Sequence, residues 1–326
     1  MGSDSIALPL LESLHTRPPA GHTLRAVFTQ PDRPVGRGKR IQPNAIARWA
    51  DERGVAVFKP ERLDVSTETW FRDEAIDFVI VMAYGHLLKK SLLALSPLGF
   101  VNLHASLLPA YRGASPIEAA VADGLNETGV SLMRIIPRMD AGEVADRETI
   151  SISAEDTTPI VREKLAAASL RLIERNGLAL STGRLVWQPQ DETQVTYTRK
   201  LTKADSALDF HQSATVLVNR IRALTPWPGS SFIHEGVSIK VAGARAGDAV
   251  TAAPGTVLGM VGEALGVAAG GSTLLISQLQ RPGGQWLDAA AFLRGYPLET
   301  GTTLDSMPML PLAAPVPFNK PTAHSK

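Results

Sequence analysis

Cysteine is absent from the 326-residue sequence. A disulfide framework, a thiolate nucleophile and a cysteine-ligated zinc site are therefore excluded, and the absence fits a reducing compartment. An excess of either charge is lacking too, because 33 Lys+Arg oppose 32 Asp+Glu and leave a formal net charge of +1. A protein that covers nucleic acid or an anionic membrane with its whole surface has a larger imbalance, so any basic site must be local.

Long apolar runs are missing as well. The longest run in the first third of the sequence, residues 78–83, is far shorter than the ~20 residues that cross a bilayer. Met1 is followed by Gly-Ser-Asp and not by the basic start of a signal peptide. We therefore expect a soluble, cytoplasmic monomer without a membrane partner, built of about two domains at the usual ~150 residues each.

The first half of the sequence alternates short apolar runs with helix-like stretches, which is typical of an α/β domain whose parallel sheet is covered on both faces. The expected strands are residues 24–28, 55–58, 78–83, 100–104 and 130–135, with 78–83 central because it shows no polar alternation. The expected helices are one beginning at Pro43, 67–74, 115–123, and 159–175 ending near Asn176-Gly177. We therefore predict a mostly parallel sheet in a domain of residues 1–186.

The start of the sequence departs from this pattern. Ile6, Leu10, Leu11 and Leu14 make a helix-like face directly after Gly2-Ser3-Asp4, which resembles the turn that follows a first strand. No strand precedes that turn in the sequence. Either the sheet starts differently from its relatives, or the start codon was placed inside the first strand.

The second half has a different texture. Residues 187–203 carry almost no apolar periodicity and are predicted to be a linker. Residues 204–306 hold a helix at 213–222 and short β-rich runs at 231–233, 237–241, 255–261 and 273–279, split by glycines, which indicates a small β-barrel. Residues 307–326 are rich in proline and are predicted to be disordered.

Asn102 and His104 are the most specific pair of polar residues in the first domain. They lie two apart at the end of an expected strand, so they share one face near the sheet edge where open α/β sheets bind ligands. Asp140 follows the next expected strand, and a parallel sheet brings such strand ends to one edge. Taken alone, an Asn-x-His pair more often hydrogen-bonds a neighbouring loop.

Longer motifs favour a catalytic role for these residues over a structural one. Four motifs contain the pair or follow it in the sequence: Asn102–Pro109, Arg112–Ile117, Thr128–Val130 and Met139–Gly142. Together they strongly resemble the Rossmann-like domain of formyltransferases that use 10-formyltetrahydrofolate. Residues 30–40, 222–229 and 254–256 are similar to the specific loop and the C-terminal OB-like barrel of the methionyl-tRNA formyltransferase family. The resemblance implies formyl transfer to methionyl-initiator tRNA, with tetrahydrofolate as the second product.

The resemblance also implies roles for residues. Asn102 would donate to the oxyanion, and His104 and Asp140 would handle the proton of the amine. The folate pocket would be formed by Ser106, Leu107, Leu108, Pro109, Tyr84, Gly85, Leu87, Leu88 and Gly142, although Leu87 and Leu88 suit ordinary core packing equally well. No metal site is predicted, because the other histidines lack ligand spacing.

A basic loop at residues 32–48 carries a net charge of +4 from Arg33, Arg37, Lys39, Arg40 and Arg48 against Asp32. Such a concentration suits a phosphate backbone, but taken alone it suits a solvated loop slightly better. With the resemblance, Arg37 is expected to insert at the end of the tRNA acceptor stem. Arg199, Lys200 and Lys203 are expected to extend the positive track.

Two alternatives remain open from the sequence. One is a folate-dependent formyltransferase that acts on a sugar or purine amine, which has no need of the basic loop. The other is a non-catalytic RNA-binding relative, inactive because the first strand is missing.

Overall fold

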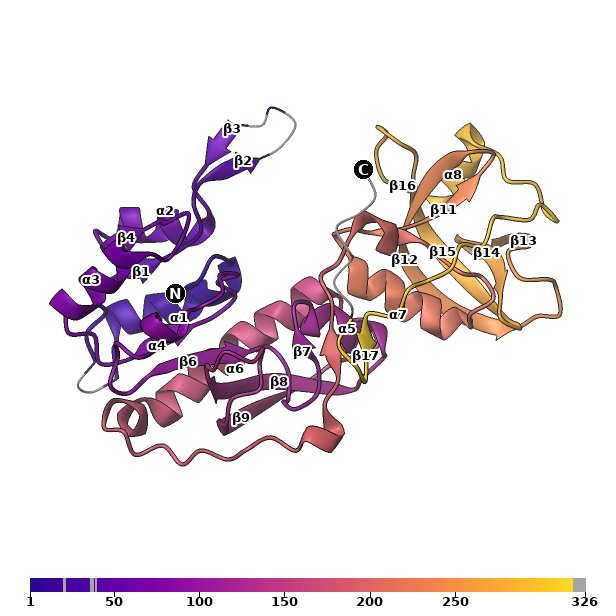
Figure 1. The fold of residues 1–326 in the computed structure, drawn as a ribbon. Helices are drawn as coiled ribbons and strands as arrows, with labels where there is room; N and C mark the ends of the chain where they lie inside the picture. Colours follow the sequence, from indigo (N-terminus) through magenta and orange to yellow (C-terminus); the bar gives the residue numbers. More distant parts are fainter. Residues whose placement is uncertain (20–21, 36–37, 39, 319–326) are drawn as a thin grey trace, which may run out of the picture. The chain divides into compact units, whose positions relative to one another are not determined.

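The computed structural model describes residues 1–19, 22–35, 38 and 40–318 (Figure 1). The chain forms two compact units, and both are discontinuous in the sequence. The first unit consists of Met1–Gly113, Glu127–Ser151 and Arg162–Thr196. The second consists of Ala114–Asn126, Ile152–Val161 and the chain from Tyr197 on.

The main sheet of the first unit has the strand order β5 (Val79–Val81), β6 (Phe100–His104), β8 (Glu127–Arg134) and β9 (Val144–Ser151). The β5–β6 pair is parallel, as is the separate pair β1 (Val27–Phe28) and β4 (Val57–Phe58). The prediction of a parallel sheet is wrong for the strand at 130–135, because β8 runs antiparallel to both β6 and β9.

The helices of the first half lie near their expected positions. They are η1 (Ser5–Ala7), α1 (Leu8–Thr16), α2 (Ala45–Glu52), α3 (Val65–Asp73) and α6 (Thr158–Ser181). Helix α4 (Lys90–Leu93) is a further helix that the sequence did not predict. Helix α2 begins after Asn44, whose side chain accepts from the amides of Ile46 and Ala47. Helix α6 continues past the expected end at Asn176-Gly177, and the Asn176 amide donates to Asp146 and to the Leu172 carbonyl.

Met1–Ser3 takes the position of a strand between β1 and β5. The Gly2 amide donates to the Phe28 carbonyl at 3.0 Å, and Met82 N donates to the Met1 carbonyl at 2.9 Å. Gly2 and Met82 form a parallel bridge. The expected strand 78–83 is therefore flanked by β6 on one side and, among the described residues, by this short segment on the other.

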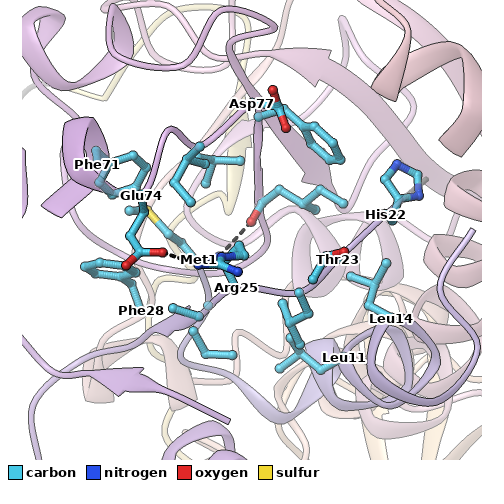
Figure 2. A pocket seen from close by; sticks show the side chains of 18 of the residues that line it. Met1, Leu11, Leu14, His22, Thr23, Arg25, Phe28, Phe71, Glu74 and Asp77 are labelled. Carbon is cyan, nitrogen blue, oxygen red and sulfur yellow. Dashed lines mark hydrogen bonds and ion pairs between the residues drawn. The ribbon is translucent and has the colours of Figure 1, made fainter.

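A cavity of about 550 Å³ lies beside Met1 (Figure 2). Its wall is largely apolar, with Leu11 and Leu14 of α1 on one side and Phe71 of α3 on another. The Met1 ammonium lies in this wall and donates to the Ile80 carbonyl at 2.7 Å. Burial lowers the pKa of that amine from 8.0 to about 5. The cavity is therefore bounded by α1, by the residues that lead into β1 and by the residues that lead into β5.

The second unit is built on an antiparallel sheet. Its order is β11 (Ser230–His234), β12 (Val237–Ala249), β15 (Ser272–Gln280), β14 (Ala264–Ala269) and β13 (Val257–Val261), with β16 (Leu287–Asp288) on β15. The pairings among the described residues do not close into a ring, so the expected barrel is not confirmed. The sequence did not predict β14, because Ala-Leu-Gly-Val-Ala-Ala is poor in β-branched residues.

Helices pack on this sheet through one apolar core. They are α7 (Ala214–Leu224), which replaces the expected 213–222, and α8 (Ala289–Gly295). Helix α5 (Pro116–Ala122) packs against α7. Phe210, Phe232 and Ile276 are fully buried in the core. No helix in the part of the chain that the structure describes is long and apolar enough to span a membrane.

The expected tail belongs to the second unit as far as Phe318. Strand β17 (Ala313–Ala314) pairs with β10 (Tyr197–Thr198), and Leu312 is only 2% exposed. Residues 307–318 are therefore not the disordered segment that their prolines suggested, because β17 pairs with β10 and the Leu312 side chain is buried. The remainder of the predicted tail, 319–326, lies outside the described residues.

Candidate active site

Strand β6 carries Asn102 and His104 on one face. Between them, Leu103 is 2% exposed, and the neighbouring Val101 is fully buried. Asn102 lies opposite Val81 and Met133 in the sheet and is half-buried. Its side-chain amide has no hydrogen-bond partner among the described residues, so its donors are available to a ligand.

His104 is held by one ring nitrogen and presents the other. Its Nε2 lies 2.9 Å from the Tyr111 carbonyl oxygen, which only accepts, so this nitrogen carries a hydrogen. Its Nδ1 faces Asp140 Oδ2 at 3.8 Å, longer than a hydrogen bond. The imidazole is 6% exposed. Nδ1 is therefore the ring atom that can take up or release a proton.

Asp140 reaches His104 by a different route from the one that the sequence predicted. The expected reason was that parallel strands end at one edge, but β8 is antiparallel to β6 and ends at the far edge. The loop after β8 folds back instead. The Gly113 amide donates to Asp140 Oδ2 at 2.8 Å, and Asp140 has a left-handed φ of 47°. Such a backbone angle in a non-glycine residue needs support from its surroundings.

Gly142 is required by the same loop. A Cβ atom at this position would collide with the Arg134 carbonyl oxygen, which belongs to the backbone of β8. The predicted folate-site residue Gly142 therefore lets the loop lie against the end of the strand.

The segment Ser106–Pro109 is built around a buried serine of the neighbouring strand. Ser131 Oγ donates to the Ser106 carbonyl at 2.7 Å and accepts from Leu108 N at 3.0 Å. Ser106 is fully buried, and its hydroxyl donates to the Ala110 carbonyl. Leu108 is 1% exposed, whereas Leu107 and Pro109 are half-buried. The backbone of this segment is therefore fixed without a ligand.

The segment Tyr84–Leu88 divides its side chains between core and solvent. Tyr84 and Leu88 are buried in the cluster around Phe71, and burial raises the pKa of the Tyr84 hydroxyl to about 12. Leu87 is 83% exposed, and Gly85 has a left-handed φ of 78°. Of the two leucines, Leu88 thus packs in the core and Leu87 is accessible to a ligand.

The predicted RNA contacts lie in two places. Arg33 and Arg40 stand on the hairpin of β2 (Arg33–Val35) and β3 (Arg40–Gln42), and the exposed Arg33 pairs with Glu61 at 3.1 Å. Arg37 and Lys39 lie outside the described residues.

Of the other three, Lys200 and Lys203 are exposed. Arg199 is bound to the fully buried Asp205, with its Nη1 at 2.9 Å from Oδ2. This ion pair leaves Arg199 little freedom to contact a phosphate.

The cavity beside Met1 contains none of Asn102, His104 or Asp140. No group of three or more potential metal ligands occurs within the described ranges.

Comparison with known proteins gives the class. Residues 2–175 match the model of the formyl transferase family, and residues 200–297 match that of the formyl transferase C-terminal domain. Because the first match covers more than half of the chain, the chain belongs to the formyl transferase family. A methionyl-tRNA formyltransferase from Granulibacter bethesdensis is 39% identical over 94% of this chain and 96% of the relative. One from Methylococcus capsulatus is 38% identical over 91% and 96%. The chain belongs to the methionyl-tRNA formyltransferase family.

Solved structures agree on the fold. An N-formyltransferase from Helicobacter canadensis, crystallised with folinic acid and dTDP-3-aminofucose, has a TM-score of 0.62 at 15% identity and covers 86% of this chain and 97% of its own. HypX from Aquifex aeolicus, crystallised with tetrahydrofolic acid, has a TM-score of 0.57 at 16% identity and covers 87% and 51%.

Proposed function

We propose that this protein transfers the formyl group of 10-formyltetrahydrofolate to the amino group of methionyl-initiator tRNA, with Asn102, His104 and Asp140 as its catalytic residues. Membership of the family supports the reaction. The observation that carries the site is that His104 Nδ1 lies 3.8 Å from Asp140 Oδ2. His104 lies on strand β6, which also presents the unpartnered Asn102 amide. The reaction takes place in the cytoplasm in this proposal, and the enzyme acts as a monomer.

The reaction exchanges one bond to the formyl carbon, moves protons and builds up negative charge on the formyl oxygen. The amine nitrogen bonds to the formyl carbon, the bond from that carbon to the donor nitrogen breaks, and a proton leaves the amine while one reaches the donor nitrogen. Negative charge develops on the formyl oxygen during the attack and needs a donor. Asn102 supplies one without a positive charge that would repel an incoming ammonium. His104 Nδ1 and Asp140 are placed to take the proton of the amine, directly or through a water.

Replacing Asn102 with Ala is expected to lower the single-turnover rate by about 10²–10³, the usual effect of removing one oxyanion donor. Affinity for the folate donor should change little, because the charge is present only during attack. The measurement is the rate of formylmethionyl-tRNA formation beside folate affinity. Asn126→Ala, at an exposed position, is the control. A normal rate for Asn102→Ala would show that this residue is structural.

The donor is proposed to bind beside this group. Backbone atoms of Ser106–Pro109, Tyr84–Gly85 and Gly142 would bind the polar edge of the pterin ring, with Leu107 and the exposed Leu87 covering it. The cofactor requirement is therefore a formyl-folate and no metal ion. Leu88 and the Leu108 side chain would act by holding these backbone segments in place, because both side chains are buried.

The tRNA is proposed to bind through basic residues at two places. Arg33, Arg37, Lys39 and Arg40 would contact the acceptor end, and Lys200 and Lys203 would contact its backbone, with Arg199 fixing the segment through Asp205. In this proposal residues 1–186 are the catalytic domain, 187–203 connect it to an OB-like tRNA-binding domain at 204–306, and 307–326 follow as a tail.

Arg37→Ala is expected to weaken transfer to methionyl-tRNA by at least tenfold and to leave slow hydrolysis of the folate donor unchanged, because water needs no positioning by the loop. Loss of one phosphate contact should also lower the log–log salt slope by about 1. The comparison is with Arg72→Ala, since Arg72 is exposed and pairs only with Glu68 among the described contacts. An unchanged rate of transfer to methionyl-tRNA and an unchanged salt slope would show that the basic loop is solvated and does not contact the tRNA.

The decisive experiment for the function is transfer of labelled formyl from 10-formyltetrahydrofolate to three acceptors: methionyl-initiator tRNA, an amino-sugar nucleotide and a purine-precursor amine. Product on the tRNA alone is the expected result. Product on a small amine alone would contradict the proposal. Binding of tRNA without any transfer would indicate the non-catalytic relative.

A further inference from the structure

The segment 187–196, which the sequence predicts to be part of a linker, is bonded to the loop that carries Asp140. Gln190 Nε2 donates to the carbonyl of Asp140 at 2.8 Å and to the carbonyl of Gly142 at 2.7 Å. Its Oε1 accepts from Arg112 Nε at 3.1 Å and from Nη2 at 2.8 Å. Carbonyls only accept and a guanidinium only donates, so these partners fix the orientation of the amide.

Arg112 holds the Gln190 side chain through its own contacts with neighbouring residues. Its side chain is fully buried, and its Nη2 lies 2.9 Å from Glu192 Oε1. The hydrogen bond from Arg112 lowers the pKa of Glu192, so this carboxylate stays charged at neutral pH. Arg112 N also donates to the Thr196 carbonyl at 2.9 Å. The contacts with Gln190 and Glu192 therefore hold the guanidinium in one place, and the bond to Thr196 fixes the backbone of Arg112.

Asp140 is thereby held from two sides. The Gly113 amide fixes its carboxylate at 2.8 Å, and Gln190 fixes the carbonyls on both sides of the turn that begins there. This support is needed because β8 ends at the far edge of the sheet and Asp140 has a left-handed φ of 47°. Gln190 lies outside both matched family segments, 2–175 and 200–297.

We propose that Gln190 is a positioning residue, which uses Arg112 as its support to set the place of the Asp140 carboxylate opposite His104. This inference rests on the proposed formyl transfer. Gln190 touches no reacting atom. Its contribution is to the rate of the chemical step, since the proton transfer that Asp140 supports depends on the distance to Nδ1.

Two substitutions separate positioning from simple stability. Gln190→Ala removes both donors and also removes one acceptor of Arg112, whose Nη2 still lies 2.9 Å from Glu192 Oε1. Gln190→Glu keeps an acceptor for Arg112 but removes the two donors and places negative charge against the carbonyls of Asp140 and Gly142. If Gln190 only satisfies Arg112, the Glu variant should be fully active. If it positions Asp140, the Glu variant should be slow although its Tm stays near that of the wild type.

The experiment measures single-turnover formyl transfer to methionyl-tRNA, KM for the tRNA, the pH profile of the rate and Tm. We expect both variants to lose about 10- to 100-fold in rate, as is usual when a partner of a reacting group is removed. KM should stay within about threefold, and the acidic limb of the pH profile should move, because the distance between Asp140 and His104 changes. Gln188→Ala is the matched control, since Gln188 is exposed and lies two residues away.

The outcomes are distinct. A slow Gln190→Glu protein with normal KM and Tm supports the proposal. A Gln190→Glu protein as fast as the wild type, or equal losses in Gln188→Ala, overturns it. Absence of formyl transfer by the wild type overturns the proposed function itself, and the positioning role falls with it.

Discussion

Asp140→Asn is expected to lower the single-turnover rate of formyl transfer by about 10²–10⁴, the usual effect of losing a group that moves a proton. The substitution keeps the shape of the side chain, and an amide oxygen can still accept from the Gly113 amide. What it removes is the negative charge 3.8 Å from His104 Nδ1. An amide can neither stabilise an imidazolium at that distance nor accept a proton from the amine.

Folate affinity of the Asp140→Asn protein should stay within a few-fold, and His104→Ala should behave alike, because both side chains act on charge that develops during attack. Glu143→Gln is the control, since it makes the same chemical change in the same loop at a side chain that is 46% exposed. If either variant loses folate binding and retains the chemical rate, the catalytic assignment is wrong.

The free energy of unfolding is expected to rise by about 3 kcal/mol between pH 5 and pH 8 because of the Met1 amine, out of a total of about 1.4 kcal/mol for each unit of its pKa shift. Burial lowers the pKa of this amine from 8.0 to about 5. Between those values the unfolded chain holds a proton that the folded chain does not, so raising the pH favours the folded state. The stability is lost again as the pH falls towards 5. Denaturant unfolding over this pH range measures it.

His22 and His86 act in the same direction, because burial lowers the pKa of each imidazole. The Met1 contribution is therefore isolated by comparing proteins that differ only before Met1. A Val-Leu-Val-Val extension spans about 13 Å as a strand, at ~3.3 Å per residue, and would move the amine out of the cavity wall. It should reduce the pH dependence and add several kcal/mol at pH 8, at about 1.5–3 kcal/mol for each buried side chain.

A Gly-Ser-Gly-Ser extension of equal length is the control, because it supplies no apolar side chains to the 550 Å³ cavity. Equal stability of the two extended proteins would show that the cavity does not accept a strand.

Local patterns in the sequence determined much of this protein. The 3.6-residue spacing of apolar residues and the short apolar runs located α3, α5, α7 and five strands of the first unit to within a few residues. The same local information placed Asn102 and His104 on one face of β6, because alternate residues of a strand share a face. The motif around them was enough to indicate the family, since it depends on residue types at fixed spacing.

Only the tertiary structure decided what depends on strand direction and on contacts between distant segments. An apolar run at 130–135 reads the same in a parallel and an antiparallel strand, so the reversal of β8 and the folded-back course to Asp140 could not be predicted. Gln190 lies in a stretch without apolar periodicity, and its amide has a role only once Arg112 and the turn at Gly142 surround it. Side-chain periodicity is a property of neighbouring residues, whereas the direction of a strand and the partner of a buried amide are selected by packing across the whole domain.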